Sequence, residues 1–203
     1  MKKKRIFSAL AALLMCLSLP VFASASQAVE PRFTMGWRWE NCPSTIYFYC
    51  DGSCPTSHRN AIRSAMNKWN AVKTPDGDSM ITVALTTDTS KQHNKITYGS
   101  LSDGPGYMRE TVLDGYIVAA NIILSDTANW STVGASNAYD VQTVFQHELG
   151  HALGVAHCHE SETRAKCYSS TCLKNVMNPD IAKGQKRTTF QEYDTSSYIL
   201  IYW

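Results

Sequence analysis

The most restrictive feature of this 203-residue chain is an eleven-residue window, residues 147–157, which reads HELGHALGVAH. Two of its histidines, His147 and His151, are four residues apart, and an α-helix with that spacing carries both imidazoles on one face. Gly154 can adopt the left-handed conformation that ends a helix and turns the chain, so His157 can return as a third ligand. Three neutral imidazoles that leave one tetrahedral position open are typical of a catalytic zinc site.

This window resembles the zinc-binding motif of the metzincin metallopeptidases, H-E-x-x-H-x-x-G-x-x-H, at all five fixed positions. The shorter H-E-x-x-H motif can occur by chance on a surface helix, but the added glycine and third histidine make the match specific. The resemblance implies that His147, His151 and His157 bind one catalytic Zn²⁺. It also implies that Glu148 is the general base, which takes a proton from the zinc-activated water that attacks a peptide carbonyl.

A second motif lies 20 residues after His157, where the chain reads Asn-Val-Met-Asn-Pro. Its Met177 resembles the methionine of the metzincin Met-turn, which packs beneath the zinc and supports the histidines, although an ordinary core methionine is the alternative. Astacin-like and serralysin-like enzymes carry a tyrosine ligand two residues after this methionine, and here that position is Pro179. The pattern is therefore closer to the matrixins, and we predict no fifth protein ligand.

The N-terminus indicates export. Four basic residues follow Met1, an apolar run extends from Ile6 to Val21, and Ala-Ser-Ala follows at 23–25. The run is too short for a stable membrane span, so we predict a signal peptide over 1–25 and a metzincin-like zinc metallopeptidase catalytic domain over 26–203. The protein is therefore expected to be secreted, without a membrane anchor.

Charge excludes other classes of partner. The formal net charge is +2, and subtracting the four basic residues of the leader leaves about −2 for the mature chain. Nothing therefore indicates binding to nucleic acid or to an anionic membrane. We expect a monomer whose partner is a protein or peptide substrate.

Six cysteines follow the leader, and an even number in an exported protein predicts three disulfides, for which 15 pairings are possible. Three lie near the N-terminus and three after His157, so if all pair, at least one disulfide joins the two groups. Cys158 directly follows a predicted ligand, and we favour a disulfide to Cys167 or Cys172 over a free thiolate that competes for the metal. The candidates are Cys42, Cys50, Cys54, Cys158, Cys167 and Cys172.

Hydrophobic periodicity predicts an α+β fold. The order of the predicted elements resembles that of the metzincin/zincin-like catalytic domain. The resemblance implies a twisted mixed β-sheet with two helices above the cleft and an irregular C-terminal subdomain with one helix below it. We interpret 102–106 as a loop and 114–115 as a turn, and the last helix is predicted to begin with a capping box from Thr189 to Glu192. Strands are predicted at 45–49, 81–85, 95–99 and 116–124, and helices at 55–72, 139–153 and 189–203.

The resemblance implies that a substrate lies extended along the edge strand of the sheet. By position we assign that edge to 116–124, and we expect the primed-side pocket near Val144 and the segment 179–188. His58, His93 and His159 are interpreted as surface residues. Acidic loop residues could bind Ca²⁺ as in matrixins, but none reproduces a calcium loop; they are Asp76, Asp78, Asp103, Asp114 and Asp126.

The sequence thus predicts a secreted zinc-dependent endopeptidase. One alternative is a non-catalytic secreted zinc-containing binding protein that keeps the metal site as a remnant. Glu148 argues against it, because a remnant site has no need of a general base. The other alternative is a protease restricted to one narrow target.

Overall fold

The structure is a computed structural model that describes residues 34–158 and 172–203. The predicted signal peptide, His159 and Cys167 lie outside these residues.

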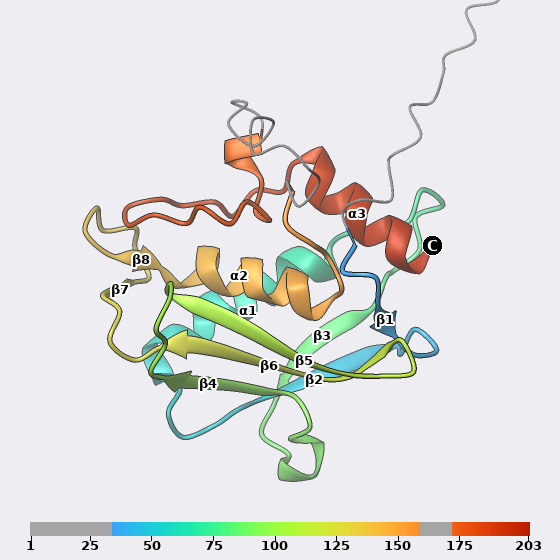
Figure 1. The fold of residues 1–203 in the computed structure, drawn as a ribbon, viewed down its shortest axis with the longest axis horizontal. Coiled ribbons are helices and arrows are strands. Elements are labelled where there is room, and N and C mark those ends of the chain that lie inside the picture. Colours follow the sequence, from blue (N-terminus) through green and yellow to red (C-terminus); the bar gives the residue numbers. More distant parts are fainter. Residues whose placement is uncertain (1–33, 159–171) are drawn as a thin grey trace, which may run out of the picture.

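A six-stranded mixed sheet forms one layer of the molecule (Figure 1). Its strand order is β1-β6-β4-β2-β3, all parallel, and β5 pairs antiparallel with β6. Two short strands, β7 (Trp130–Ser131) and β8 (Tyr139–Asp140), pair separately. The sheet strands are β1 (Arg38–Trp39), β2 (Thr45–Cys50), β3 (Thr82–Thr86), β4 (Lys95–Gly99), β5 (Gly106–Leu113) and β6 (Tyr116–Ser125).

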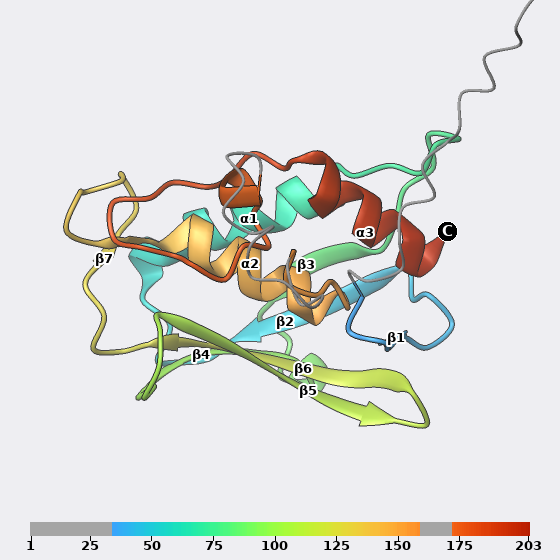
Figure 2. The same cartoon turned by 45° about the horizontal axis from the view of Figure 1, so that its top comes forward.

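The helices cover one face of this sheet. Figure 2 shows α1 (Arg59–Asn70) and α2 (Val141–Ala152) above the strands, with α3 (Glu192–Tyr202) and the preceding segment beyond them. Short 3-10 turns occur at Thr56–His58, Thr89–Lys91 and Cys172–Lys174. The predicted two helices against a mixed sheet, with a mostly irregular C-terminal part and one further helix, are confirmed.

The core lies between the sheet and the helices. α1 buries residues at helical spacing, and its Trp69 is fully buried. The Trp69 ring contacts Phe190 and Tyr198, with centroids 4.4 and 5.2 Å away, and its indole N–H donates to the Gln146 carbonyl at 2.9 Å. One tryptophan therefore joins α1, α2 and the C-terminal segment, which fixes the position of α2.

Strand β5 is absent from the sequence prediction. Only Met108 among its residues is buried, so the segment lacks the alternation that marks a half-buried strand. The turn at 114–115 was predicted. Asp114 (φ 51°) and Gly115 (φ 83°) both have positive φ, as in the two-residue turns that close β-hairpins. That hairpin pairs β5 with β6.

The assignment of 116–124 as the edge strand is wrong. β6 occupies this range, but it pairs with β5 on one side and with β1 and β4 on the other. β5 is the edge beside β6, and β3 is the opposite edge. The strong hydrophobicity of β6 reflects its internal position.

The start of the last helix also differs from the prediction. α3 begins at Glu192, and its capping box is formed by Gln191 and Asp194 instead of Thr189 and Glu192. Both boxes fit the spacing of a capping motif. The packing of Phe190 against Trp69 places the chain in the observed register.

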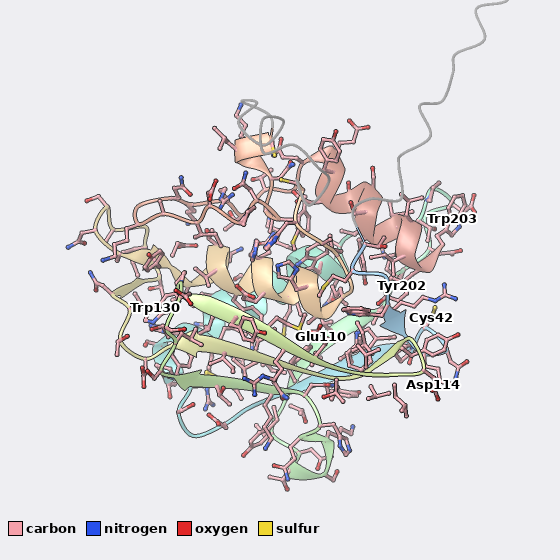
Figure 3. The ribbon with its side chains drawn as sticks, in the orientation of Figure 1. Cys42, Glu110, Asp114, Trp130, Tyr202 and Trp203 are labelled. Carbon is pink, nitrogen blue, oxygen red and sulfur yellow. A yellow bond between two sulfur atoms is a disulfide. The ribbon has the colours of Figure 1, made fainter. Side chains whose placement is uncertain are left out.

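The disulfide prediction needs correction. Cys50 and Cys54 form a disulfide within the N-terminal group, whereas Cys42 is an exposed free cysteine. Figure 3 shows Cys42 and Tyr202 at the same end of the molecule. A bridge between the N-terminal and C-terminal groups would then require Cys42, which the structure leaves unpaired. The Sγ atoms of Cys158 and Cys172 lie 2.9 Å apart, so these two cysteines of the C-terminal group lie side by side.

Candidate active site

The structure brings the imidazoles of His147, His151 and His157 together. Their Nε2 atoms lie 3.2 Å apart for His147–His151 and for His147–His157, and 3.0 Å apart for His151–His157. His147 and His151 come from successive turns of α2, and His157 follows the turn at Gly154. This is the one group of three metal-ligating side chains among the described residues.

The turn that returns His157 depends on Gly154. Its φ is +86°, and an added Cβ would lie 2.7 Å from the Trp37 carbonyl oxygen. α2 ends just before it, where the indole N–H of Trp39 donates to the Ala152 carbonyl at 2.8 Å and the Tyr202 hydroxyl donates to the Leu153 carbonyl at 3.1 Å. These donors satisfy carbonyls that the end of a helix leaves unpaired.

Backbone carbonyls orient two of the rings. Nδ1 of His147 donates to the Val176 carbonyl, and Nδ1 of His151 donates to the Val155 carbonyl, each at 2.8 Å. Because each Nδ1 carries the proton, Nε2 keeps its lone pair and faces the common centre. Burial lowers the pKa of His147 well below its usual range and lowers the pKa of His151 to about 4, with the neighbouring imidazoles adding to both shifts.

These residues fit a zinc ion. Two nitrogens, each about 2.0–2.1 Å from a tetrahedral zinc, are ~3.3 Å apart, close to the Nε2 separations in this site. The imidazoles of His147 and His151 are neutral, as ligation requires, and their Nδ1 atoms already donate to backbone carbonyls. The set offers three ligands, so a bound zinc would keep a fourth position for water or substrate.

Glu148 lies beside this centre on α2 and is 6% exposed. Burial raises the pKa of its carboxyl to about 8, and the backbone N–H of Met108 on β5, which donates to the carboxylate, partly opposes this shift. A buried carboxyl with a raised pKa next to a metal site has the properties expected of a general base.

Met177 packs beneath α2 and is buried. Gly150 makes this possible, because an added Cβ there would overlap the Met177 sulfur and lie 2.9 Å from the Trp69 ring. The Met177 carbonyl accepts from the Cys158 N–H at 3.1 Å. The methionine thus lies against the helix that carries His147 and His151.

Two residues that hold the backbone around Met177 were not predicted from the sequence. Asp194 at the start of α3 accepts the backbone N–H groups of Val176 and Met177, at 3.1 and 3.0 Å. Arg187 donates to the carbonyls of Asn175 and Asp180, at 3.1 and 2.9 Å. The one sequence signal was the position of Asp194, three residues after Gln191, which fits a capping box.

The structure also places the other histidines and the residues expected near the primed-side pocket. His93 is exposed as expected, but His58 is half-buried and its Nδ1 lies 2.8 Å from the Tyr98 hydroxyl, so its interpretation as a simple surface residue is wrong. The segment 185–188 lines a cavity of about 360 Å³ with Leu173 and Lys174. Val144 is fully buried against the core.

Comparisons with known proteins agree with this geometry. The matrixin family model matches residues 45–186, which is more than half of the chain. The chain belongs to the matrixin family. It is therefore a zinc metalloendopeptidase, and its three convergent histidines are positioned to bind the metal.

Solved structures with a similar arrangement include myroilysin, with a TM-score of 0.50 and 12% identity, covering 84% of this chain and 97% of that chain. High choriolytic enzyme 1, a hatching enzyme zinc-protease from the medaka fish Oryzias latipes, has a TM-score of 0.40 and 16% identity, covering 81% and 93%. At these identities the likeness to myroilysin supports the fold alone. Among curated protein sequences none matches this chain.

Proposed function

We propose that the protein is a secreted endopeptidase in which His147, His151 and His157 hold the zinc and Glu148 is the general base. The convergence of three Nε2 atoms within about hydrogen-bond distance of one another, beside a buried carboxylate, is the observation that supports this best. Zinc bound there would lower the pKa of a coordinated water and polarise the substrate carbonyl.

Glu148 would take the proton from the attacking water and pass it to the leaving amine. Its burial favours this role, because a carboxyl whose pKa is raised toward neutrality can both accept and release a proton near pH 7. Met177 and the carbonyls of Val155 and Val176 would hold the histidines in place. No nucleophilic serine or cysteine is needed.

The substrate would lie along β5. This strand is the sheet edge next to α2, and an extended peptide can add to such an edge through backbone hydrogen bonds. The segment after Met177, including Pro179 and Ile181, would form the facing wall. We keep 1–25 as a proposed signal peptide and 26–203 as the catalytic domain. None of the described helices is long and apolar enough to cross a membrane.

The experiment is a comparison of wild-type protein with Glu148→Gln and Glu148→Asp, each analysed for zinc and for cleavage of a peptide substrate. Removing a general base costs about 10²–10⁴ in rate, so Glu148→Gln should retain one zinc per chain and lose nearly all activity. Glu148→Asp keeps the carboxylate but shortens it, and should be intermediate. Full activity of Glu148→Gln would refute the proposed mechanism.

A further inference from the structure

Strand β5 turns every second backbone amide away from the sheet. The Pro105 carbonyl accepts from the Ser125 N–H at 2.9 Å, and the register pairs Tyr107 with Ile123. The carbonyl of Pro105, which has no N–H, and the N–H and C=O groups of residues 107 and 109 therefore point at β6. In an antiparallel pair the direction alternates, so those of Gly106, Met108 and Glu110 face outward.

The outward N–H of Met108 has a hydrogen-bond acceptor within the protein. It donates to the carboxylate of Glu148, which is buried between α2 and β5. A carboxyl group that accepts a fixed backbone N–H is held in one orientation, because the N–H donates along a single direction. The other oxygen is then directed by the same contact.

Gly106 provides the space for this arrangement. A Cβ on Gly106 would lie 2.9 Å from Oε1 of Glu148 and 3.0 Å from its Cγ, and 2.7 Å from Cγ1 of Val144. These distances are shorter than ordinary carbon contacts, so any side chain here would displace Glu148 or Val144. Glycine is required at this position by packing against α2.

We propose that the backbone from Gly106 to Met108 is a positioning element for Glu148. The missing side chain of Gly106 gives the carboxylate its place, and the outward N–H of Met108 sets its orientation. The importance of this element for catalysis rests on the proposed role of Glu148 as general base. It means that the strand proposed to receive the substrate also holds the base.

The contact itself is tested by amide hydrogen exchange, measured by NMR on the folded protein. The Met108 amide should exchange at least about tenfold more slowly than that of Glu110, whose N–H faces the same way on β5. Glu148→Ala should remove this difference. Equal rates in the wild type, or protection of Met108 that survives Glu148→Ala, would overturn the contact. Neither readout depends on catalysis.

The positioning role is tested by steady-state kinetics. An alanine at 106 would clash with both Val144 and Glu148, and Val144→Ala removes the first clash. The double variant Val144→Ala/Gly106→Ala is therefore compared with the single variant Val144→Ala. We expect kcat to fall at least about tenfold, with KM changed much less and one zinc retained. The matched control is Gly99→Ala on β4, where the nearest atom to an added Cβ is 3.8 Å away. An unchanged kcat in the double variant, or a loss matched by lost zinc, would refute the role.

The Met108 N–H is tested by comparing Met108→Pro, which removes the N–H, with Met108→Ala, which keeps it. Proline is tolerated at an edge strand whose N–H faces outward. If the N–H positions Glu148, Met108→Pro lowers kcat relative to Met108→Ala; if it serves only the substrate, KM alone rises and the proposal fails. Activity of Glu148→Gln equal to wild type would refute the general base while leaving the exchange result standing.

Discussion

The imidazoles of His147 and His151 are kept neutral by the same surroundings that direct them at one point. Burial, with the neighbouring imidazoles, disfavours the charged form of His147 and His151, and it outweighs the carbonyls that accept from each Nδ1, which raise the pKa. A proton therefore competes poorly for Nε2 in the folded protein. The site can accept a metal without first releasing protons from these two rings near pH 7.

His157 contributes from outside α2, and its loss tests whether the turn at Gly154 completes the site. We expect His157→Ala to lower zinc affinity at least about 100-fold, measured by competition with a chromophoric chelator, because a direct ligand is removed. His93→Ala, at an exposed position, is the control. Unchanged metal affinity would contradict a third-ligand role.

Glu148 gives a pH-dependent stability in the metal-free protein. Its pKa is about 8 in the folded state and 4.5 as the reference value, so between these values the folded protein binds the proton and the unfolded chain does not. The free energy of unfolding therefore falls as pH rises from 4.5 through 8, because unfolding then releases the proton of Glu148. Glu148→Gln removes that decrease.

The expected result is that metal-free Glu148→Gln becomes more stable relative to metal-free wild type as pH rises from 5 to 8. Each unit of pKa shift corresponds to about 1.4 kcal/mol. Urea unfolding of both proteins at pH 5, 6.5 and 8 measures this difference. A difference that stays constant with pH would show that the carboxyl is not buried in this way.

At the scale of elements, α3 supports the metal site without touching it. Its Asp194 accepts the N–H groups of Val176 and Met177, and the Val176 carbonyl accepts Nδ1–H of His147. Burial raises the pKa of Asp194, and the three backbone N–H groups that it accepts, with Arg187 nearby, favour its charged form. The start of α3 thereby fixes the backbone that orients a ligand.

Asp194→Asn should weaken this support, because an amide presents a donor to a backbone N–H. We expect zinc affinity to fall by about tenfold and unfolding to become easier by about 1–3 kcal/mol. Glu192→Gln removes a charge from an exposed position two residues away on the same helix and serves as the control. Zinc affinity equal to wild type in Asp194→Asn would show that the turn is held by other contacts.

Local sequence signals predicted α2, its histidines and the turn at Gly154, because helical spacing and a left-handed glycine act over a few residues. They did not predict β5, whose strand state comes from pairing with β6. The cap of α3 was placed wrongly because packing of Phe190 on Trp69, 121 residues apart in sequence, selects the register. The pairing of Cys50 and the solitary position of Cys42 likewise depend on tertiary placement.

At the scale of the whole molecule, zinc would join α2 to the segment after it. His147 and His151 belong to the helix over the sheet, His157 follows the turn, and the Val176 carbonyl ties the C-terminal part to His147. A ligand that binds only the folded state stabilises it in proportion to the logarithm of its concentration relative to Kd.

Removal of zinc by a chelator should therefore lower the Tm. At free zinc about 1,000 times Kd the stabilisation is about 4 kcal/mol, which corresponds to roughly 10 °C for a domain of this size. Calorimetry before and after chelation measures the shift, and readdition of zinc should restore the Tm. A Tm that chelation leaves unchanged would contradict a metal that joins these parts.

The most direct test of the central claim is metal content and cleavage measured on one preparation of the oxidised mature protein. Denatured casein is the substrate, with and without a zinc chelator and after readdition of zinc. The account predicts one zinc per chain and cleavage that is lost with the metal and restored with it. A protein purified without zinc, and unable to bind it when supplied, would contradict the proposed metal site. Cleavage that persists after complete removal of zinc would contradict the mechanism.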